Sequence, residues 1–296
     1  MLTMLIGVLE QGVIYGIMAL GLCISYKILN FPDLTVDGSF PLGAAVSAAL
    51  IALGVNPWLA LLASFAAGAC AGLLTGLLHV KLKITDLLAG IIMMTGLYSV
   101  NYRIVGKANA PLFNNALLFN SGPVKSIADA VPALEPYITL ISLVLIVLVC
   151  KLLLDLYLKT KSGMLLIAAG DNAALVTSLA KNPGTVKILG LALANGLVAL
   201  SGAVACNYNR TFDVTMGVGT MVTGLASVVI GVTIFRKVKF MKMTTMAIIG
   251  CIIYKGCVML ALNLGMESFD MKLIIAVLFV LTLIINKFVT RRDSIA

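Results

Sequence analysis

Long apolar runs alternate along the chain with short stretches rich in polar and charged residues. The runs lie at 5–28, 39–54, 58–79, 86–105, 137–157, 187–206, 217–235, 243–264 and 272–288. Most match the roughly 20 apolar residues that an α-helix needs to cross the hydrocarbon core of a bilayer. The pattern therefore predicts an all-α, polytopic transmembrane helical bundle of about eight to nine spans. The run at 39–54 is short, so we expect either a span or a re-entrant segment there.

Basic residues set the expected orientation of these spans. They gather in the stretches Lys81–Lys83, Lys159–Lys187, Arg236–Lys242 and Lys287–Arg292. Cytoplasmic loops of membrane proteins carry an excess of lysine and arginine. The stretch 105–136 has mixed charge and several prolines, so we expect it on the external side. Counting spans from these anchors places the C-terminus in the cytoplasm and the N-terminus outside.

The composition agrees with a membrane protein and excludes several other classes. Hydrophobic residues make up 61% of the 296 residues and charged residues only 11%, where soluble domains carry about 25%. A soluble enzyme could not cover its surface with so few charges, and a disordered chain needs low hydrophobicity. The net charge of +9 lies between the apolar runs, so it indicates membrane topology rather than a nucleic-acid partner. We expect one transmembrane domain, 1–296, in contact with the lipid bilayer.

Side chains suited to catalysis or metal binding are scarce. The chain has one histidine, and its six cysteines lie in or at the end of apolar runs without a CxxC pair. These features predict free apolar thiols and no metal site. No G-x-x-x-x-G-K-[ST] phosphate loop occurs, so we expect that the chain does not hydrolyse ATP by itself and is not an enzyme. We expect it to bind no cofactor of its own.

Two stretches of the chain, one beginning at Gly16 and the other at Gly196, share a pattern. Six residues of the first recur as the same type at the matching positions of the second: Gly16, Ala19, Leu20, Asp33, Thr35 and Ser47. A chance match within a small apolar alphabet is the alternative explanation. Both stretches place Asp, Gly and Thr between two apolar runs, the first on the predicted inner side and the second on the outer side. Inverted repeats with broken helices beside the substrate are a recurring transporter design, so we predict repeat halves at 1–158 and 159–296.

Polar and flexible residues in these breaks and inside the spans are candidates for a translocation path. They are Asp33, Thr35, Asp37, Gly38, Ser39, Asn195, Asp213, Gly217, Gly219 and Lys255. Lys255 lies midway along a run, where a charge is costly, so we expect it to face the bundle interior or a cavity, paired with an acid. Asp33, Asp37 and Asp213 are alternative partners for it. Asn195 can either hydrogen-bond between helices or face the path.

The longest internal loop, 162–187, contains a short helical pattern. Asp171 or Asn172 can cap a helix over 172–181, which a Pro-Gly pair would end. One face of this helix would carry Leu175, Val176 and Leu179. A short, partly apolar helix exposed to the cytosol fits a groove on a partner protein. The alternative is that it lies on the membrane surface or packs beneath the bundle.

Several stretches resemble a known family over nearly the whole chain. They are Phe31–Ala45, Leu87–Ser99, Ala169–Asn172, Leu191–Ala203 and Gly224–Gly231. With these motifs the chain resembles the permease subunits of bacterial ABC importers in the branched-chain amino acid and ribose class. Within that class it is most similar to the subgroup paired with a lipoprotein-like binding protein, some members of which are linked to aromatic amino acids.

The resemblance implies a permease that moves a small solute, foremost an amino acid, by alternating access at a homodimer axis in the bacterial plasma (inner) membrane. It implies as partners a second copy of the chain, two cytoplasmic ABC ATPase subunits that bind ATP-Mg, and an external solute-binding protein or lipoprotein. It also implies that 162–187 is a coupling segment that docks on the ATPase. The residues it assigns to this coupling are Gly170, Asp171, Asn172, Leu175, Val176, Ser178 and Leu179.

One position departs from the family pattern. Val232 follows Gly231 where an acidic residue is expected. If that carboxylate serves the cytoplasmic gate or the coupling, coupling in this chain differs or is lost. An ion-coupled secondary transporter is the alternative function, because Lys255 and the segment with Asp33 and Asp37 would suit proton or sodium coupling.

Overall fold

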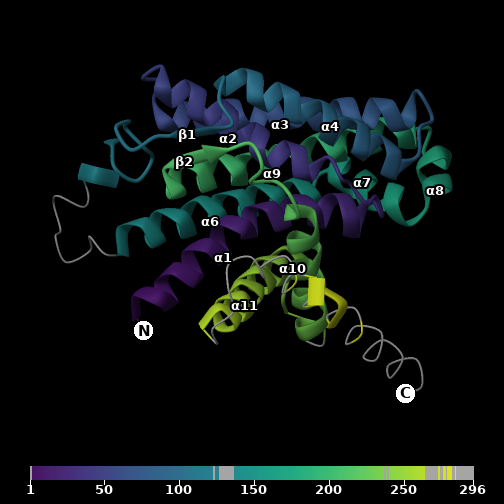
Figure 1. Ribbon diagram of the computed structural model, residues 1–296. Coiled ribbons are helices and arrows are strands. Elements are labelled where there is room, and N and C mark those ends of the chain that lie inside the picture. The colour runs from purple at the N-terminus through teal and green to yellow at the C-terminus, as the bar shows by residue number, and fades with distance from the viewer. Residues whose placement is uncertain are drawn as a thin grey trace.

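The protein is a bundle of long helices in a computed structural model (Figure 1). The described residues are 2–122, 124–126, 137–236, 238 and 240–263, with isolated positions between 273 and 284. The helices are α1 (Leu2–Leu22), the π-helix η1 (Cys23–Ile28), α2 (Val36–Ala52), α3 (Pro57–Val80), α4 (Asp86–Val105), α6 (Ile138–Leu158), α7 (Lys161–Asp171), α8 (Ala173–Ser178), α9 (Pro183–Asn209), α10 (Thr220–Phe235) and α11 (Met243–Asn263). In Figure 1, α2, α3 and α4 lie above α9, α6 and α1, and α10 and α11 lie below them.

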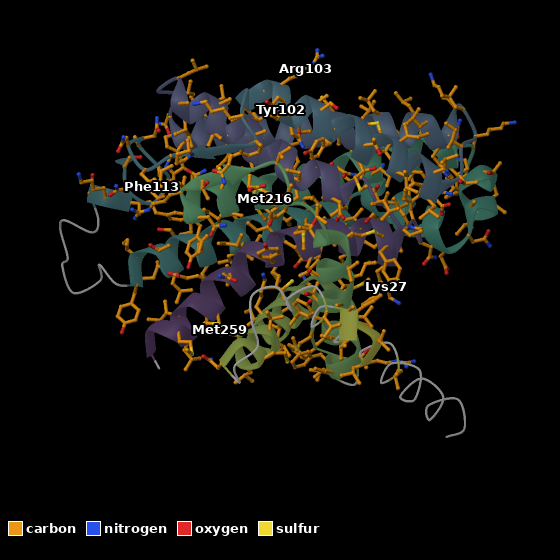
Figure 2. All side chains as sticks on the ribbon, viewed as in Figure 1. Lys27, Tyr102, Arg103, Phe113, Met216 and Met259 are labelled. Atoms are coloured by element: carbon orange, nitrogen blue, oxygen red, sulfur yellow. The ribbon has the colours of Figure 1, made fainter. Side chains whose placement is uncertain are left out.

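Six stretches of helix in the described part are long and apolar enough to cross a membrane. They are Met4–Ile28, Pro57–Val80, Asp86–Val105, Ile138–Leu158, Pro183–Asn209 and Met243–Ala261. Side chains project all around the bundle (Figure 2), and large apolar ones such as Leu62, Leu145 and Leu153 remain exposed. The polytopic helical bundle predicted from the sequence is therefore confirmed. The predicted span at 272–288 lies almost wholly outside the described residues.

Two predicted spans, 39–54 and 217–235, correspond to shorter apolar helices. α2 has 17 residues and α10 has 16. At a rise of 1.5 Å per residue these helices are about 26 and 24 Å long, less than the roughly 30 Å of a hydrocarbon core. Each follows non-helical backbone, residues 29–35 before α2 and residues 210–219 before α10. We name these segments the first break and the second break, and both lie where the sequence predicts broken helices.

A short antiparallel ribbon, which the sequence did not predict, joins β1 (Asn109–Pro111) to β2 (Thr211–Asp213). It pairs Asn109 with Asp213 and so ties the stretch 105–136 to the second break. In Figure 1 the ribbon lies at the same end of the bundle as the start of α6, and α7 and α8 lie at the other end. The stretches predicted to be external and cytoplasmic are thus at opposite ends of the molecule.

Glycines let α3 approach α9 closely. A side chain on Gly72 would collide with the carbonyl of Leu191, and one on Gly68 would collide with Asn195 and Ala199. Small residues at every fourth position allow two helix backbones to come into direct contact in a membrane. The spacing of these glycines in the sequence predicts such a contact, and α9 is the helix that makes it.

The central helices α1 and α9 run antiparallel. Glu10 near the start of α1 is bonded to Tyr208 near the end of α9. At the other end of α1, a side chain on Gly21 would meet the carbonyl of Ala194. Because α1 and α9 begin the two stretches of the predicted repeat, equivalent helices of the two stretches point in opposite directions. This is the geometry of an inverted repeat.

The packing between helices recurs in the register of the repeat. α3 packs along α9, and α11 packs along α1. A side chain on Gly76 of α3 would lie 2.8 Å from Ile188 of α9, and the neighbour of Gly256 of α11 is Val8 of α1. In the repeat, Gly256 is the counterpart of Gly76 and Val8 is the counterpart of Ile188. These matched contacts favour a repeat over a chance match, while the boundaries 1–158 and 159–296 stay a prediction.

Candidate functional site

The first break is held at the centre of the bundle by a buried carboxylate. Asp33 is fully buried, and its Oδ1 accepts a hydrogen bond from the Thr35 amide at 2.9 Å. Its Oδ2 accepts a bond of 2.6 Å from Nδ2 of Asn195 on α9. The Oδ1 of Asn195 accepts one of 2.7 Å from Ser39 on α2. A buried charge is tolerated only with such partners, so Asp33, Asn195 and Ser39 form one network that joins the first break to α2 and α9.

Both polar atoms of the Asn195 side chain form hydrogen bonds in this network. Its Nδ2 also donates to the carbonyl of Leu191, at 3.1 Å, within α9. Of the two alternatives left by the sequence, the structure shows the hydrogen bond between helices. Thr35 adds a second link, because its hydroxyl lies 2.9 Å from that of Thr75 on α3. The first break is therefore bonded to α2, α3 and α9 together.

The second break repeats the local turn of the first. The Asp213 Oδ1 accepts hydrogen bonds from the Thr215 amide at 2.7 Å and from the Thr215 hydroxyl at 2.6 Å. Asp33 and Thr35 make the same amide bond at the equivalent place in the first break. The surroundings differ, because Asp213 is only partly buried and has Asn109 of β1 as its other neighbour, at 3.4 Å. The same sequence pattern thus builds the same turn at the bundle centre and at one end of it.

Asp37, two residues after the first break, connects the start of α2 to the end of the second break and the start of α10. Its Oδ1 accepts hydrogen bonds from the Met221 amide at 2.7 Å and the Thr220 hydroxyl at 3.0 Å, and its Oδ2 accepts one from the Gly219 amide at 3.0 Å. A carboxylate at this place satisfies free amides and complements the positive end of the helix dipole. Asp37, from the first turn of α2, is therefore the N-terminal cap of α10. We name Asp37 with residues 217–221 the junction.

Glycines make the junction possible. A side chain on Gly217 would collide with the carbonyl of Asp37 and the ring of Pro41. Gly219 has φ of +82°, which side chains disfavour. Gly38 lies on the other side of α2, where its carbonyl accepts a bond of 3.1 Å from Asn101 of α4. The structure thus gathers most of the predicted path residues into the Asp33 network and the junction.

Lys255 does not pair with an acid, contrary to the sequence-based expectation. Its Nζ lies 3.6 Å from the ring centroid of Tyr15 on α1, and that ring stacks on Phe40 at 5.6 Å. The described residues include no ion pair of Lys255. The three candidate acids bond to other groups instead. A cation over an aromatic face gains energy from the ring quadrupole, which is how this partly buried lysine is accommodated.

Sequence reasoning missed Asp155. This residue of α6 is 7% exposed and accepts hydrogen bonds from Lys151 at 3.0 Å, Lys242 at 2.9 Å and the Thr244 hydroxyl at 2.7 Å. Lys242 directly precedes α11 and Thr244 lies in its first turn, so Asp155 fastens the end of α6 to the start of α11. The available signal was a Lys and an Asp four residues apart in an otherwise apolar run.

The sequence matches a known protein family over nearly its whole length. Over residues 4–286 the chain matches the family described as "Branched-chain amino acid transport system / permease component". The chain belongs to this permease family. As a member, the permease is a multi-pass membrane component of a transport system, and its named relatives are transport permeases rather than enzymes.

Two relatives and one solved structure illustrate the match. The permease is 46% identical over 276 residues to the "Tyrosine transport system permease protein" of Clostridioides difficile (strain R20291), covering 93% of this chain and 89% of the relative. It is 27% identical over 286 residues to the "Ribose import permease protein RbsC" of Escherichia coli (strain K12), covering 95% and 85%. "PsaBC from Streptococcus pneumoniae in complex with Fab" aligns with a TM-score of 0.51 and 13% identity, over 95% of this chain and 90% of that one. This last likeness shows the fold alone.

The loop 162–187 of the permease contains two short helices rather than one. Asn172 caps α8 as predicted, since its Oδ1 accepts a bond of 3.0 Å from the Ala174 amide, but α8 ends at Ser178 and not at residue 181. The helix before it, α7, was not predicted. The apolar face is also corrected: Val176 is fully buried, whereas Leu175 and Leu179 are 51% and 56% exposed. Val176 anchors α8, and the two leucines remain outside.

The helix α7 touches the first break. A side chain on Gly170 would collide with the carbonyl of Ile28, at the end of η1. The Asn30 side chain donates a hydrogen bond of 3.1 Å to the Gly170 carbonyl. Asn30 has φ of +51°, an uncommon value that this contact supports. The permease thus has an unbroken series of contacts from α7, through residues 28–30, to Asp33.

Proposed function

We propose that the permease is the membrane-spanning subunit of an ATP-driven ABC importer for an amino acid, with tyrosine as the first candidate. The family and the printed name of the first relative described above support this choice. The observation that carries the mechanism is the junction, where Asp37 of one repeat caps α10 of the other. This cap joins the helix after the first break to the helix after the second, so a movement of one repeat against the other would act on both breaks.

Coupling to ATP hydrolysis would enter through α7 and α8. The exposed Leu175 and Leu179 offer an apolar contact for a cytoplasmic ATPase subunit. A shift of these helices would act on the first break at once, because Gly170 is packed against Ile28 and bonded to Asn30. Packed interfaces switch between discrete arrangements rather than deform gradually. The Asp33 network and the junction are the polar contacts that such a switch would rearrange.

The remaining partners follow from the same proposal. Two ATPase subunits hold ATP-Mg, an external binding protein or lipoprotein delivers the solute, and a second copy of the permease completes the path at the dimer axis. The complex lies in the bacterial plasma membrane with the N-terminus of the permease outside and its C-terminus in the cytoplasm. Val232, a residue of α10, is partly buried against the core, so any acidic group needed for coupling comes from another residue.

The contacts of Lys255, Asp33 and Asp37 support the ATP-driven proposal over the ion-coupled alternative. Lys255 contacts Tyr15, and Asp33 and Asp37 already accept hydrogen bonds from several groups of the protein. A residue that binds a transported proton or sodium ion needs free capacity for it. The three residues that suggested ion coupling are thus all engaged in this conformation.

Reconstitution tests the proposal. The permease is purified with its associated ATPase from native membranes, placed in liposomes with the captured binding protein, and given labelled tyrosine. We expect uptake that requires ATP-Mg and stops with a non-hydrolysable ATP analogue. Uptake driven by an imposed proton or sodium gradient, without an ATPase in the preparation, would overturn the proposal in favour of the ion-coupled alternative.

A further inference from the structure

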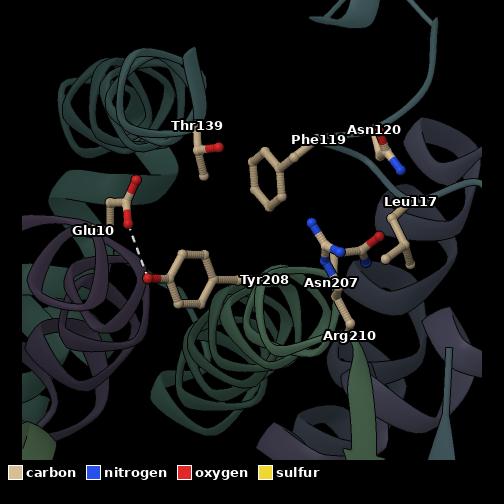
Figure 3. A pocket seen from close by; sticks show the side chains of 8 residues that line it. All are labelled: Glu10, Leu117, Phe119, Asn120, Thr139, Asn207, Tyr208 and Arg210. Atoms are coloured by element: carbon tan, nitrogen blue, oxygen red, sulfur yellow. Dashed lines mark hydrogen bonds between the residues drawn. The ribbon is translucent and has the colours of Figure 1, made fainter. Parts of the chain in front are cut away.

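A small polar cavity lies away from the Asp33 network and the junction, at the end of the bundle that carries the β-ribbon. Its volume is about 140 Å³ (Figure 3). The lining residues come from α1, the start of α6, the end of α9 and the stretch after β1: Glu10, Leu117, Phe119, Asn120, Thr139, Asn207, Tyr208 and Arg210. This end is the predicted external side, where a solute arrives in an importer.

One wall of the cavity carries a carboxylate with too few partners. Glu10 is 8% exposed, and its Oε2 accepts a bond of 2.9 Å from the Tyr208 hydroxyl. Among the described residues it has no other hydrogen bond and no ion pair. A buried carboxylate with only a neutral phenol beside it is costly, since buried charges are normally paired. Figure 3 shows the Glu10 carboxylate among the lining side chains, bonded to the Tyr208 hydroxyl.

The other wall carries a guanidinium. Arg210 follows the end of α9 with φ of +57°, and its carbonyl accepts a bond of 2.9 Å from the Leu112 amide, which fixes its backbone. In the described part of the chain its side chain has no ion pair. Figure 3 shows it beside Phe119, on the side of the cavity away from Glu10. An arginine fork is well suited to a carboxylate.

Between the two charges lie the Phe119 and Tyr208 rings, with polar groups at the margin. Asn120 and Thr139 line the cavity, and their side chains make no hydrogen bond to another described residue. Asn207, by contrast, is fully engaged with Ser47, the Ala203 carbonyl and the Leu118 amide. Within the described residues, the cavity thus combines an acid and a base that have no ion pair with an aromatic surface.

We propose that this cavity binds a free α-amino acid as a zwitterion at the outer mouth of the permease. The ammonium group contacts Glu10, the carboxylate contacts Arg210, and the side chain lies against Phe119 and Tyr208. At about 30 Å³ for each water, the volume of about 140 Å³ holds on the order of five waters, which matches the five non-hydrogen atoms of the ammonium, Cα and carboxylate of an amino acid. This inference rests on the proposed function and adds a solute site within the permease itself.

The test measures binding to the full-length permease, in nanodiscs with its associated ATPase and without the binding protein. The twenty standard amino acids are the first probes. The best binder is then compared with its decarboxylated amine and its deaminated acid. We expect the zwitterion to bind at least tenfold more tightly than either analogue. Glu10→Gln should remove the preference for the zwitterion over the deaminated acid, because the contact with the ammonium group is lost. Arg210→Gln should remove the preference for the zwitterion over the amine, because the contact with the carboxylate is lost.

Controls separate this site from general charge effects and from misfolding. Arg103→Gln changes an exposed arginine that points away from the bundle (Figure 2), and it should leave all affinities unchanged. Glu10→Gln keeps the shape of the side chain, and Arg210→Lys keeps its charge, so a folded variant remains available at each position. Size-exclusion profiles confirm the fold.

Three outcomes would overturn the inference. The first is that no amino acid binds, and the second is that the zwitterion and its analogues bind equally well. The third is that Glu10→Gln abolishes docking of the binding protein while the affinity for the solute is unchanged. That result would mean that the cavity binds a side chain of the binding protein. Uptake by the reconstituted importer is measured in parallel. ATP-driven uptake without this binding refutes the cavity site alone, whereas zwitterion binding without ATP-driven uptake refutes the importer and leaves the site.

Discussion

Because Asp37 holds the junction together, its replacement should lower the free energy of unfolding of the permease and impair transport. Asp37→Ala removes the acceptor of three hydrogen bonds at the start of α10. Loss of an ordinary helix cap costs about 0.5–2 kcal/mol, and loss of a hydrogen bond to a charged group costs about 1.5–3 kcal/mol; the cap here consists of these hydrogen bonds, so the two figures are alternative estimates and are not summed. Because Asp37 is charged but only partly buried, we expect about 1.5–3 kcal/mol for its loss. Asp37→Asn should cost about half, because one oxygen remains to accept from Met221 and Thr220.

The assay pairs stability with transport. Unfolding is followed by denaturant titration of the purified permease, and uptake by the reconstituted importer. Asp86→Ala is the matched control, since Asp86 also begins a helix but, among the described residues, its side chain accepts only from its neighbour Leu87, and it should cost less than about 1 kcal/mol. If Asp37→Ala were as stable and as active as Asp86→Ala, the junction would not be what connects the two breaks.

Three further changes probe other parts of the permease. Gly72→Leu should abolish monodisperse protein on size exclusion, because the side chain would collide with α9, whereas Gly96→Leu has open space beside it and should be tolerated. Changing both Leu175 and Leu179 to Ser should prevent recovery of the ATPase in a pull-down. The free energy of unfolding should stay unchanged, since both side chains are exposed. If the ATPase were still recovered, the docking surface would lie on other residues. Lys255→Met should keep the fold, at a cost of about 0.5–2 kcal/mol for the ring contact, and impair uptake; normal uptake would make Lys255 a scaffold residue.

Features that depend on local sequence were predicted well. The first span was expected to end at residue 28, and the helical stretch does end at Ile28. The two breaks and the cap at Asn172 also lie where expected. In each case the deciding interaction joins residues only a few positions apart, such as the bond from the Thr35 amide to Asp33. Run length and turn chemistry are therefore sufficient to locate them.

Features that depend on the packing of distant segments were not predicted. The helix α7 had a local signal in Thr160, which accepts from the Gly163 amide at 3.2 Å as an N-cap, but its place against Ile28 could not be foreseen. The burial of Val176 likewise follows from what lies beneath α8. The junction could not be predicted from the sequence for the same reason, because its acceptor and its donors come from opposite halves of the chain.

The repeat explains the unexpected partner of Lys255. In the register of the repeat, Lys255 is the counterpart of Thr75, and Tyr15 is the counterpart of Asn195. Thr75 and Asn195, one from each half, belong to the polar contacts around Asp33. At the equivalent place, the pair Lys255 and Tyr15, again one from each half, is a lysine on a tyrosine ring. The two halves thus keep one backbone frame but place a buried acid in one and a cation in the other.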